Sequence, residues 1–132
     1  MKNVCILFCA VFILFSFSAC VSQQQVKNGD SLTSDITEWP ENEYTAAVPE
    51  PHEGTPVTEI RSGDFYGIEL SGVSRQECYG YIELLEASGF ESAFPGEENQ
   101  VSGGWIYTNG NAAVTVSQSG DAMVVGVSFR PL

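Results

Sequence analysis

Apolar residues recur at three- and four-residue spacing in one stretch of the chain, between Val73 and Phe90. This spacing places them on one face of a helix, as a buried stripe formed by Cys78, Tyr81, Ile82, Leu85 and Phe90. Ser74 followed by Glu77 is a capping box, in which the two side chains satisfy free backbone N–H groups of the first turn. Gly89 can turn left-handed without steric cost and therefore predicts the end of the helix.

Alternating apolar and polar residues, rich in β-branched and aromatic types, predict strands on both sides of this helix. The expected strands are Val57–Arg61, Phe65–Leu70, Glu91–Phe94, Trp105–Thr108, Asn111–Val116 and Met123–Phe129. Asn109-Gly110 lies between two of them and is typical of a two-residue hairpin turn. Such a turn would place Tyr107 opposite Ala112.

The order strand, strand, helix, strands predicts an α+β domain over residues 57–132. In this fold a single helix packs on one face of a mainly antiparallel sheet, which gives a two-layer sandwich. A core of this size provides only a few kcal/mol of stability without a disulfide or a metal. Gly80 in the middle of the helix costs about 1 kcal/mol relative to Ala, so we expect the helix to approach the sheet closely there.

The residues before this domain have a different composition. Between residues 21 and 56, seven acidic residues accompany one Lys, which is the composition of a segment that forms no core. We predict a flexible acidic tether at residues 20–37 and a Trp- and Pro-rich lead-in at residues 38–56. Trp39 is costly to leave in water, so we expect its ring to pack on an edge of the sheet. Binding of a partner by Trp39 is the alternative.

The amino terminus has the parts of a secretory signal peptide. A basic start and an apolar run lead to Phe17-Ser18-Ala19-Cys20, which is similar to a bacterial lipobox, although that pattern prefers Leu at the first position. We predict removal of residues 1–19 and lipidation of Cys20, as a diacylglycerol thioether with palmitate-type acyl chains. The protein would then be a lipoprotein of the cell membrane, anchored on the extracytoplasmic face. An uncleaved anchor helix over residues 4–21 is the alternative.

The chain is strongly acidic, with 17 Asp and Glu against 5 Lys and Arg and a net charge of −12. Binding to nucleic acid requires clustered Lys and Arg that release counterions from phosphates, so nucleic acid is excluded as a partner. Electrostatic adhesion to anionic lipid is excluded for the same reason. Association with the membrane must therefore come from a hydrophobic anchor, while the acidity keeps the protein soluble or serves a cation site.

No catalytic residue, cofactor site or metal ligand is predicted, because the motifs of nucleophilic, phosphate-binding and zinc sites are missing from the sequence. His52 is the sole histidine and has no Cys nearby to complete a zinc site. Cys78 belongs to the apolar stripe, which favours a buried, inert thiol over a reactive one with a lowered pKa. The segment Glu97–Gln100 offers oxygen ligands for Ca²⁺ but lacks the spacing of a calcium loop.

The layout given by Trp39-Pro40, Pro49-Glu50-Pro51, Tyr81 and Gly89-Phe90 resembles a domain of unknown function found in surface lipoproteins of Gram-positive bacteria. There too, a lipobox and a low-complexity tether precede a Trp-Pro lead-in, a helix ending in Gly-Phe and a run of strands. The resemblance covers about residues 38 to 129. It implies a location and an architecture, but no reaction.

These patterns favour a non-catalytic surface module that binds a protein, a peptide or a wall polymer. A calcium-responsive module is a second hypothesis, which an increase in melting temperature with Ca²⁺ would support. A carboxylate-based hydrolase is a third, which would need two acidic residues at catalytic separation in one cleft.

Overall fold

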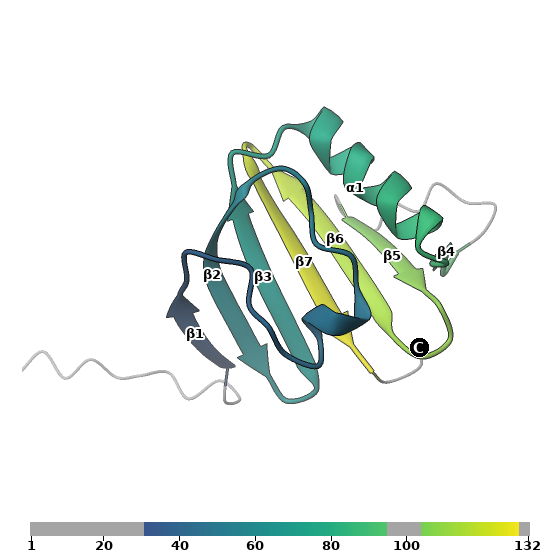
Figure 1. Cartoon of the computed structure of the whole chain (residues 1–132), viewed down its shortest axis with the longest axis horizontal. Coiled ribbons are helices and arrows are strands. Elements are labelled where there is room, and N and C mark those ends of the chain that lie inside the picture. The colour runs from purple at the N-terminus through teal and green to yellow at the C-terminus, as the bar shows by residue number, and fades with distance from the viewer. Residues whose placement is uncertain (1–30, 95–103, 130–132) are drawn as a thin grey trace, which may run out of the picture.

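The structure of the chain is a computed structural model that describes residues 31–94 and 104–129. These residues form one antiparallel sheet of seven strands in the spatial order β1-β2-β3-β7-β6-β5-β4 (Figure 1). The strands are β1 (Ser31–Asp35), β2 (Thr55–Ser62), β3 (Phe65–Ser71), β4 (Glu91–Ser92), β5 (Gly104–Thr108), β6 (Ala113–Ser119) and β7 (Ala122–Ser128). The described helices are α1 (Arg75–Ala87) and the short 3-10 helix η1 (Thr45–Ala47).

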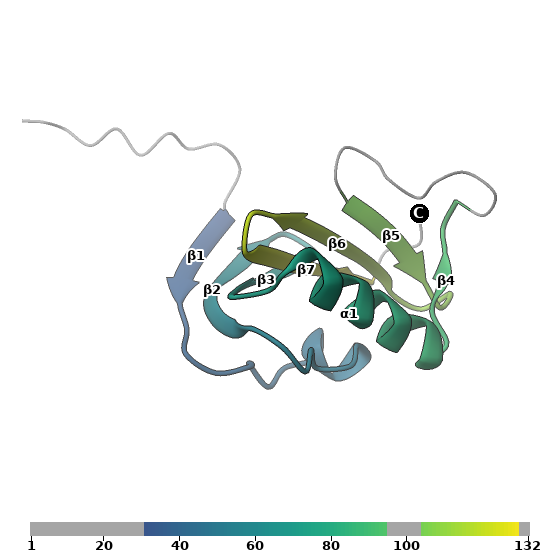
Figure 2. The ribbon, with the colours of Figure 1, turned by 90° about the horizontal axis from the view of Figure 1, so that it is seen from above.

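The sheet consists of two runs of sequential strands that meet where β3 pairs with β7. Helix α1 carries the chain from β3 to β4 at the opposite edge and packs across one face of the sheet (Figure 2). The predicted fold class is therefore confirmed: one α-helix on one face of an antiparallel sheet, an α+β two-layer arrangement.

The core lies between α1 and the central strands. The register places Ile68 of β3, Val125 of β7 and Val116 of β6 side by side, and all three are 0% exposed. From the other side, the predicted stripe of the helix is buried as expected, with Cys78, Tyr81, Ile82, Leu85 and Phe90 all in the core. The alternating apolar residues of the strands and the apolar stripe of the helix thus form a single buried layer.

Side chains and backbone define both ends of α1 as the sequence predicts. The backbone N–H of Ser74 donates to the carboxylate of Glu77 (2.6 Å), and the Ser74 hydroxyl accepts from the N–H of Glu77 (3.3 Å). At the other end Gly89 has φ +92° and its N–H donates to the carbonyl of Glu86 (3.1 Å). The N–H of Phe90 donates to the carbonyl of Leu85 (3.1 Å), which completes a Schellman motif.

The hairpin between β5 and β6 differs from the prediction. Tyr107 lies opposite Val114 rather than Ala112, so the loop holds four residues instead of two. The side-chain oxygen of Asn109 accepts the N–H groups of Asn111 (3.0 Å) and Ala112 (2.9 Å), which closes this longer turn. Since the loop grows by an even number of residues, every side chain of β6 keeps its predicted face.

The folded unit also begins earlier than predicted. Residues 31–35, placed in the tether by composition, form β1 and pair with β2, with Leu32 opposite Arg61. The tether prediction is therefore wrong for these residues. Composition did not indicate β1 because all five of its residues are exposed, and an edge strand that pairs through its backbone requires no apolar side chains. The prediction that Trp39 packs on an edge of the sheet is also wrong at β2, because the backbone of β2 pairs with β1 there. The ring instead is partly buried and packs against the hydrophobic core.

The face of the sheet opposite α1 carries small residues at its centre. Gly67 of β3 lies opposite Gly126 of β7. A side chain at either position would meet the ring of Phe65, and one at Gly126 would also meet the hydroxyl of Thr115. The Phe65 ring therefore lies over the two glycines and covers the backbone that they leave bare.

Candidate functional site: a cavity between the strap and helix α1

Residues 36–54, called the strap here, cross the same face of the sheet as α1, next to the helix (Figure 2). A local turn shapes this segment, since the side-chain oxygen of Asn42 accepts the N–H groups of Tyr44 (2.9 Å) and Thr45 (3.1 Å). The Tyr44 ring stacks on Tyr66 of β3 at 5.3 Å and on Phe129 at 5.1 Å, measured between ring centroids. The strap is thus fixed to the sheet by aromatic packing.

Two further contacts fix the strap to the helix side. The hydroxyl of Tyr81 on α1 donates to the carbonyl oxygen of Pro49 (3.0 Å), and burial raises the pKa of this hydroxyl. Gly54 has φ +92°, and a Cβ there would overlap the side chain of Val73 and lie 3.2 Å from Cβ of Leu70. The strap therefore ends in a close contact that only glycine allows.

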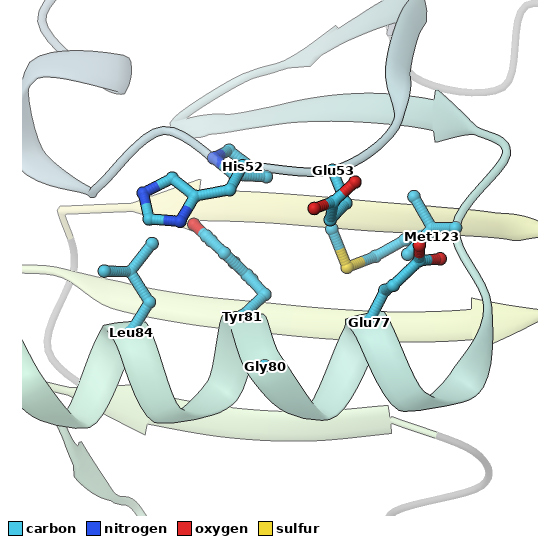
Figure 3. A pocket seen from close by; sticks show the side chains of 9 residues that line it. His52, Glu53, Glu77, Gly80, Tyr81, Leu84 and Met123 are labelled. Atoms are coloured by element: carbon cyan, nitrogen blue, oxygen red, sulfur yellow. The ribbon is translucent and has the colours of Figure 1, made fainter.

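A cavity of about 200 Å³ lies between these two contacts. It is lined by Pro51, His52 and Glu53 of the strap, by Glu77, Gly80, Tyr81 and Leu84 of α1, and by Val73 and Met123. Figure 3 shows His52 beside Tyr81 and Leu84 at one end, and Glu53, Glu77 and Met123 at the other. Buried core residues form its floor, with Val73 at 0% and Met123 at 1% exposure.

Gly80 does not serve the purpose that the sequence suggests. Nothing lies within 4 Å of a Cβ built at this position, so the prediction of a close approach between helix and sheet is wrong. The residue lines the cavity instead. Gly in a helix interior lowers stability by about 1 kcal/mol relative to Ala. Here the missing side chain leaves open space beside the strap.

The end of the cavity formed by Glu53 and Glu77 is negative. The N–H and hydroxyl of Ser74 hold the pKa of Glu77 below its usual value, so this carboxyl stays ionised at neutral pH. Within residues 31–94 and 104–129 no Lys or Arg pairs with either carboxylate. The two arginines there contact other groups: Arg61 pairs with Glu59 (3.3 Å), and Arg75 donates to the hydroxyl of Tyr79 (3.4 Å).

A second polar cluster lies under the strap at Glu59, Arg61 and Tyr66. The Tyr66 hydroxyl donates to Glu59 at 2.6 Å, and the guanidinium of Arg61 lies 5.1 Å from the centre of the Tyr66 ring. Burial, followed by the bond to Glu59, raises the pKa of Tyr66 to about 12, and the same bond lowers the pKa of Glu59. These groups satisfy one another and therefore hold the structure together rather than offering a binding site.

The residues singled out from sequence do not converge on one site. Cys78 is fully buried as predicted, and burial raises its pKa to about 11, which opposes thiolate formation. Cys20 and the segment Glu97–Gln100 lie outside the described residues. His52 and Glu77 do line the cavity, yet the sequence marked them only as a lone histidine and a helix cap. The one sequence signal of the cavity was Gly80, a helix-breaking residue inside a well-capped helix.

In the part of the chain that the structure describes, no three His, Cys, Asp or Glu side chains come together as metal ligands. No helix in that part is long and apolar enough to cross a membrane. Comparisons of the chain with protein-family models, with curated proteins and with solved structures found no match.

Proposed function

We propose that this protein is an extracytoplasmic lipoprotein, anchored to the cell membrane through Cys20, whose α+β domain is a non-catalytic binding module. The observation that carries the anchoring is the ending Phe17-Ser18-Ala19-Cys20 directly after an apolar run. The observation that supports binding is the cavity between the strap and α1, which has a buried apolar floor and the carboxyl groups of Glu53 and Glu77 at one end.

The early start of the fold adds a geometric consequence to this proposal. β1 begins at Ser31, so residues 21–30 separate a lipidated Cys20 from the sheet. Ten residues span at most about 33–36 Å even when fully extended. The domain would therefore work close to the membrane surface, with less reach than the predicted tether of residues 20–37 would allow.

The anchoring is tested by labelling expressing bacterial cells with radioactive palmitate. Cys20→Ala should abolish incorporation and leave the uncleaved precursor. Cys9→Ala is the matched control, because it removes a thiol from the apolar run without touching the lipobox, and it should label like the wild type. Phe17→Leu restores the preferred lipobox residue and should speed processing. Equal labelling of the wild type and Cys20→Ala would refute the lipoprotein assignment and favour an anchor helix.

A further inference from the structure

We propose that the cavity between the strap and α1 binds the side chain of a lysine presented by a peptide or protein. This inference deepens the binding function proposed above and rests on it, because it names the ligand class of the same site. It is carried by three features of the cavity: its size, its charge and the missing side chain at Gly80.

The size of the cavity selects one side chain. Sites for drug-sized molecules enclose about 300–1,000 Å³. The cavity here measures about 200 Å³, which suits a single long side chain better than a whole cofactor or sugar. Val73, Leu84 and Met123 give it an apolar lining, against which a straight aliphatic stem can pack.

The charge of the cavity selects a cation. Glu53 extends from the strap and Glu77 from the first turn of α1, so a bound ligand meets carboxylates from two different elements. Glu77 is held in place by both hydrogen bonds of the capping box. No described Lys or Arg neutralises the two carboxylates. An ammonium group has three donors around a point charge and can satisfy carboxylates from different directions, whereas a guanidinium prefers a single planar partner.

The glycine at position 80 fits the same function. A methyl group there would meet no neighbouring atom, so packing does not explain why the helix lacks a side chain at this point. Gly80 is exposed and lines the cavity, so a larger residue there would extend into open space at its edge. Gly80 thus lowers the stability of the helix at the place where a ligand would enter. Residues that serve binding often lower the stability of a protein in this way.

The test is a titration of the full chain in detergent micelles with N-acetyl-lysine methylamide, followed by the amide resonance of Gly54 in protein labelled with ¹⁵N-glycine. N-acetyl-norleucine methylamide is the matched probe, because it has the same stem without the ammonium group. The lysine probe should shift the Gly54 resonance saturably, and the norleucine probe should bind at least about 5-fold more weakly. Equal binding of the two probes, or no saturable shift with either, would overturn the proposal.

Variants locate the binding to the cavity. Glu77→Gln keeps the capping hydrogen bonds but removes the charge, and it should weaken lysine binding about 2- to 10-fold, as should Glu53→Gln. Glu83→Gln removes the same charge from an exposed position of α1 that does not line the cavity, and it should bind like the wild type. If Glu83→Gln weakens binding as much as Glu77→Gln, the attraction comes from the overall charge and the proposed site is refuted.

Gly80→Ala separates loss of binding from loss of folding. Alanine favours the helix, so the melting temperature should rise by about 2–8 °C while lysine binding weakens. Unchanged binding in this variant would mean that position 80 does not border the bound ligand. Palmitate labelling of Cys20 without lysine binding would refute the ligand and leave the anchor standing. Lysine binding without labelling would refute the anchor alone.

Discussion

Replacing Gly54 by alanine tests how tightly the strap is joined to the domain. Alanine at φ +92° strains the backbone, and its methyl group would overlap the side chain of Val73. A Cβ in left-handed backbone costs about 1–2 kcal/mol and overpacking about 1–3 kcal/mol, so the expected loss is about 2–5 kcal/mol. This is a large share of the roughly 5–15 kcal/mol that stabilises a domain.

The measurement is urea unfolding of the full chain, followed by tryptophan fluorescence. The midpoint should fall by about 1–2 M, since the slope for small proteins is about 1–3 kcal/mol per molar urea. Gly72→Ala is the matched control, because Gly72 has φ +73° but nothing lies within 4 Å of a Cβ built there. The control carries only the backbone strain, together with the same loss of unfolded-state entropy. If the two variants unfold at the same midpoint, the strap does not contact Val73 as described and the reasoning fails.

Three further predictions concern the core and the strap. Leu85→Ala should cost about 2–5 kcal/mol in urea unfolding because Leu85 is 0% exposed, and a loss below about 1 kcal/mol would place it outside the core. Tyr66 has a pKa raised from 10.0 to about 12, so the unfolded state ionises first and stability should fall as the pH rises from 10 to 12. Tyr66→Phe should lack this part of the alkaline loss, and identical pH profiles would contradict the assignment. In Trp105→Phe, Trp39 is the remaining tryptophan, and its partly buried ring should emit to the blue of its denatured maximum; water-like emission from the native protein would show that the ring is not docked.

Features that depend on neighbours within a few residues could be predicted from the sequence. The ends of α1 follow from Ser74, Glu77 and Gly89, whose hydrogen bonds reach no further than one helical turn. The buried stripe of the helix and the apolar face of β7 follow from periodicity, which is fixed by backbone geometry. The α+β class then follows, since each apolar face has to be covered by another element. The face of each residue in β6 was also predictable, although its register was not, because Asn109 closes a four-residue loop as readily as it starts a two-residue one.

The start of the folded unit and the position of the cavity became visible only in the three-dimensional structure. β1 has no alternating apolar pattern, and its Leu32 is exposed, because an edge strand is held by backbone pairing that any side chains permit. The cavity joins His52 and Glu53 to Glu77 and Gly80, which lie more than twenty positions further along the chain. The strap comes beside α1 because Tyr44 stacks on Tyr66 of β3 and because Gly54 permits a close contact with Val73 just before the helix. Periodicity describes which face of an element is buried, but it holds no information on where two elements leave a space between them.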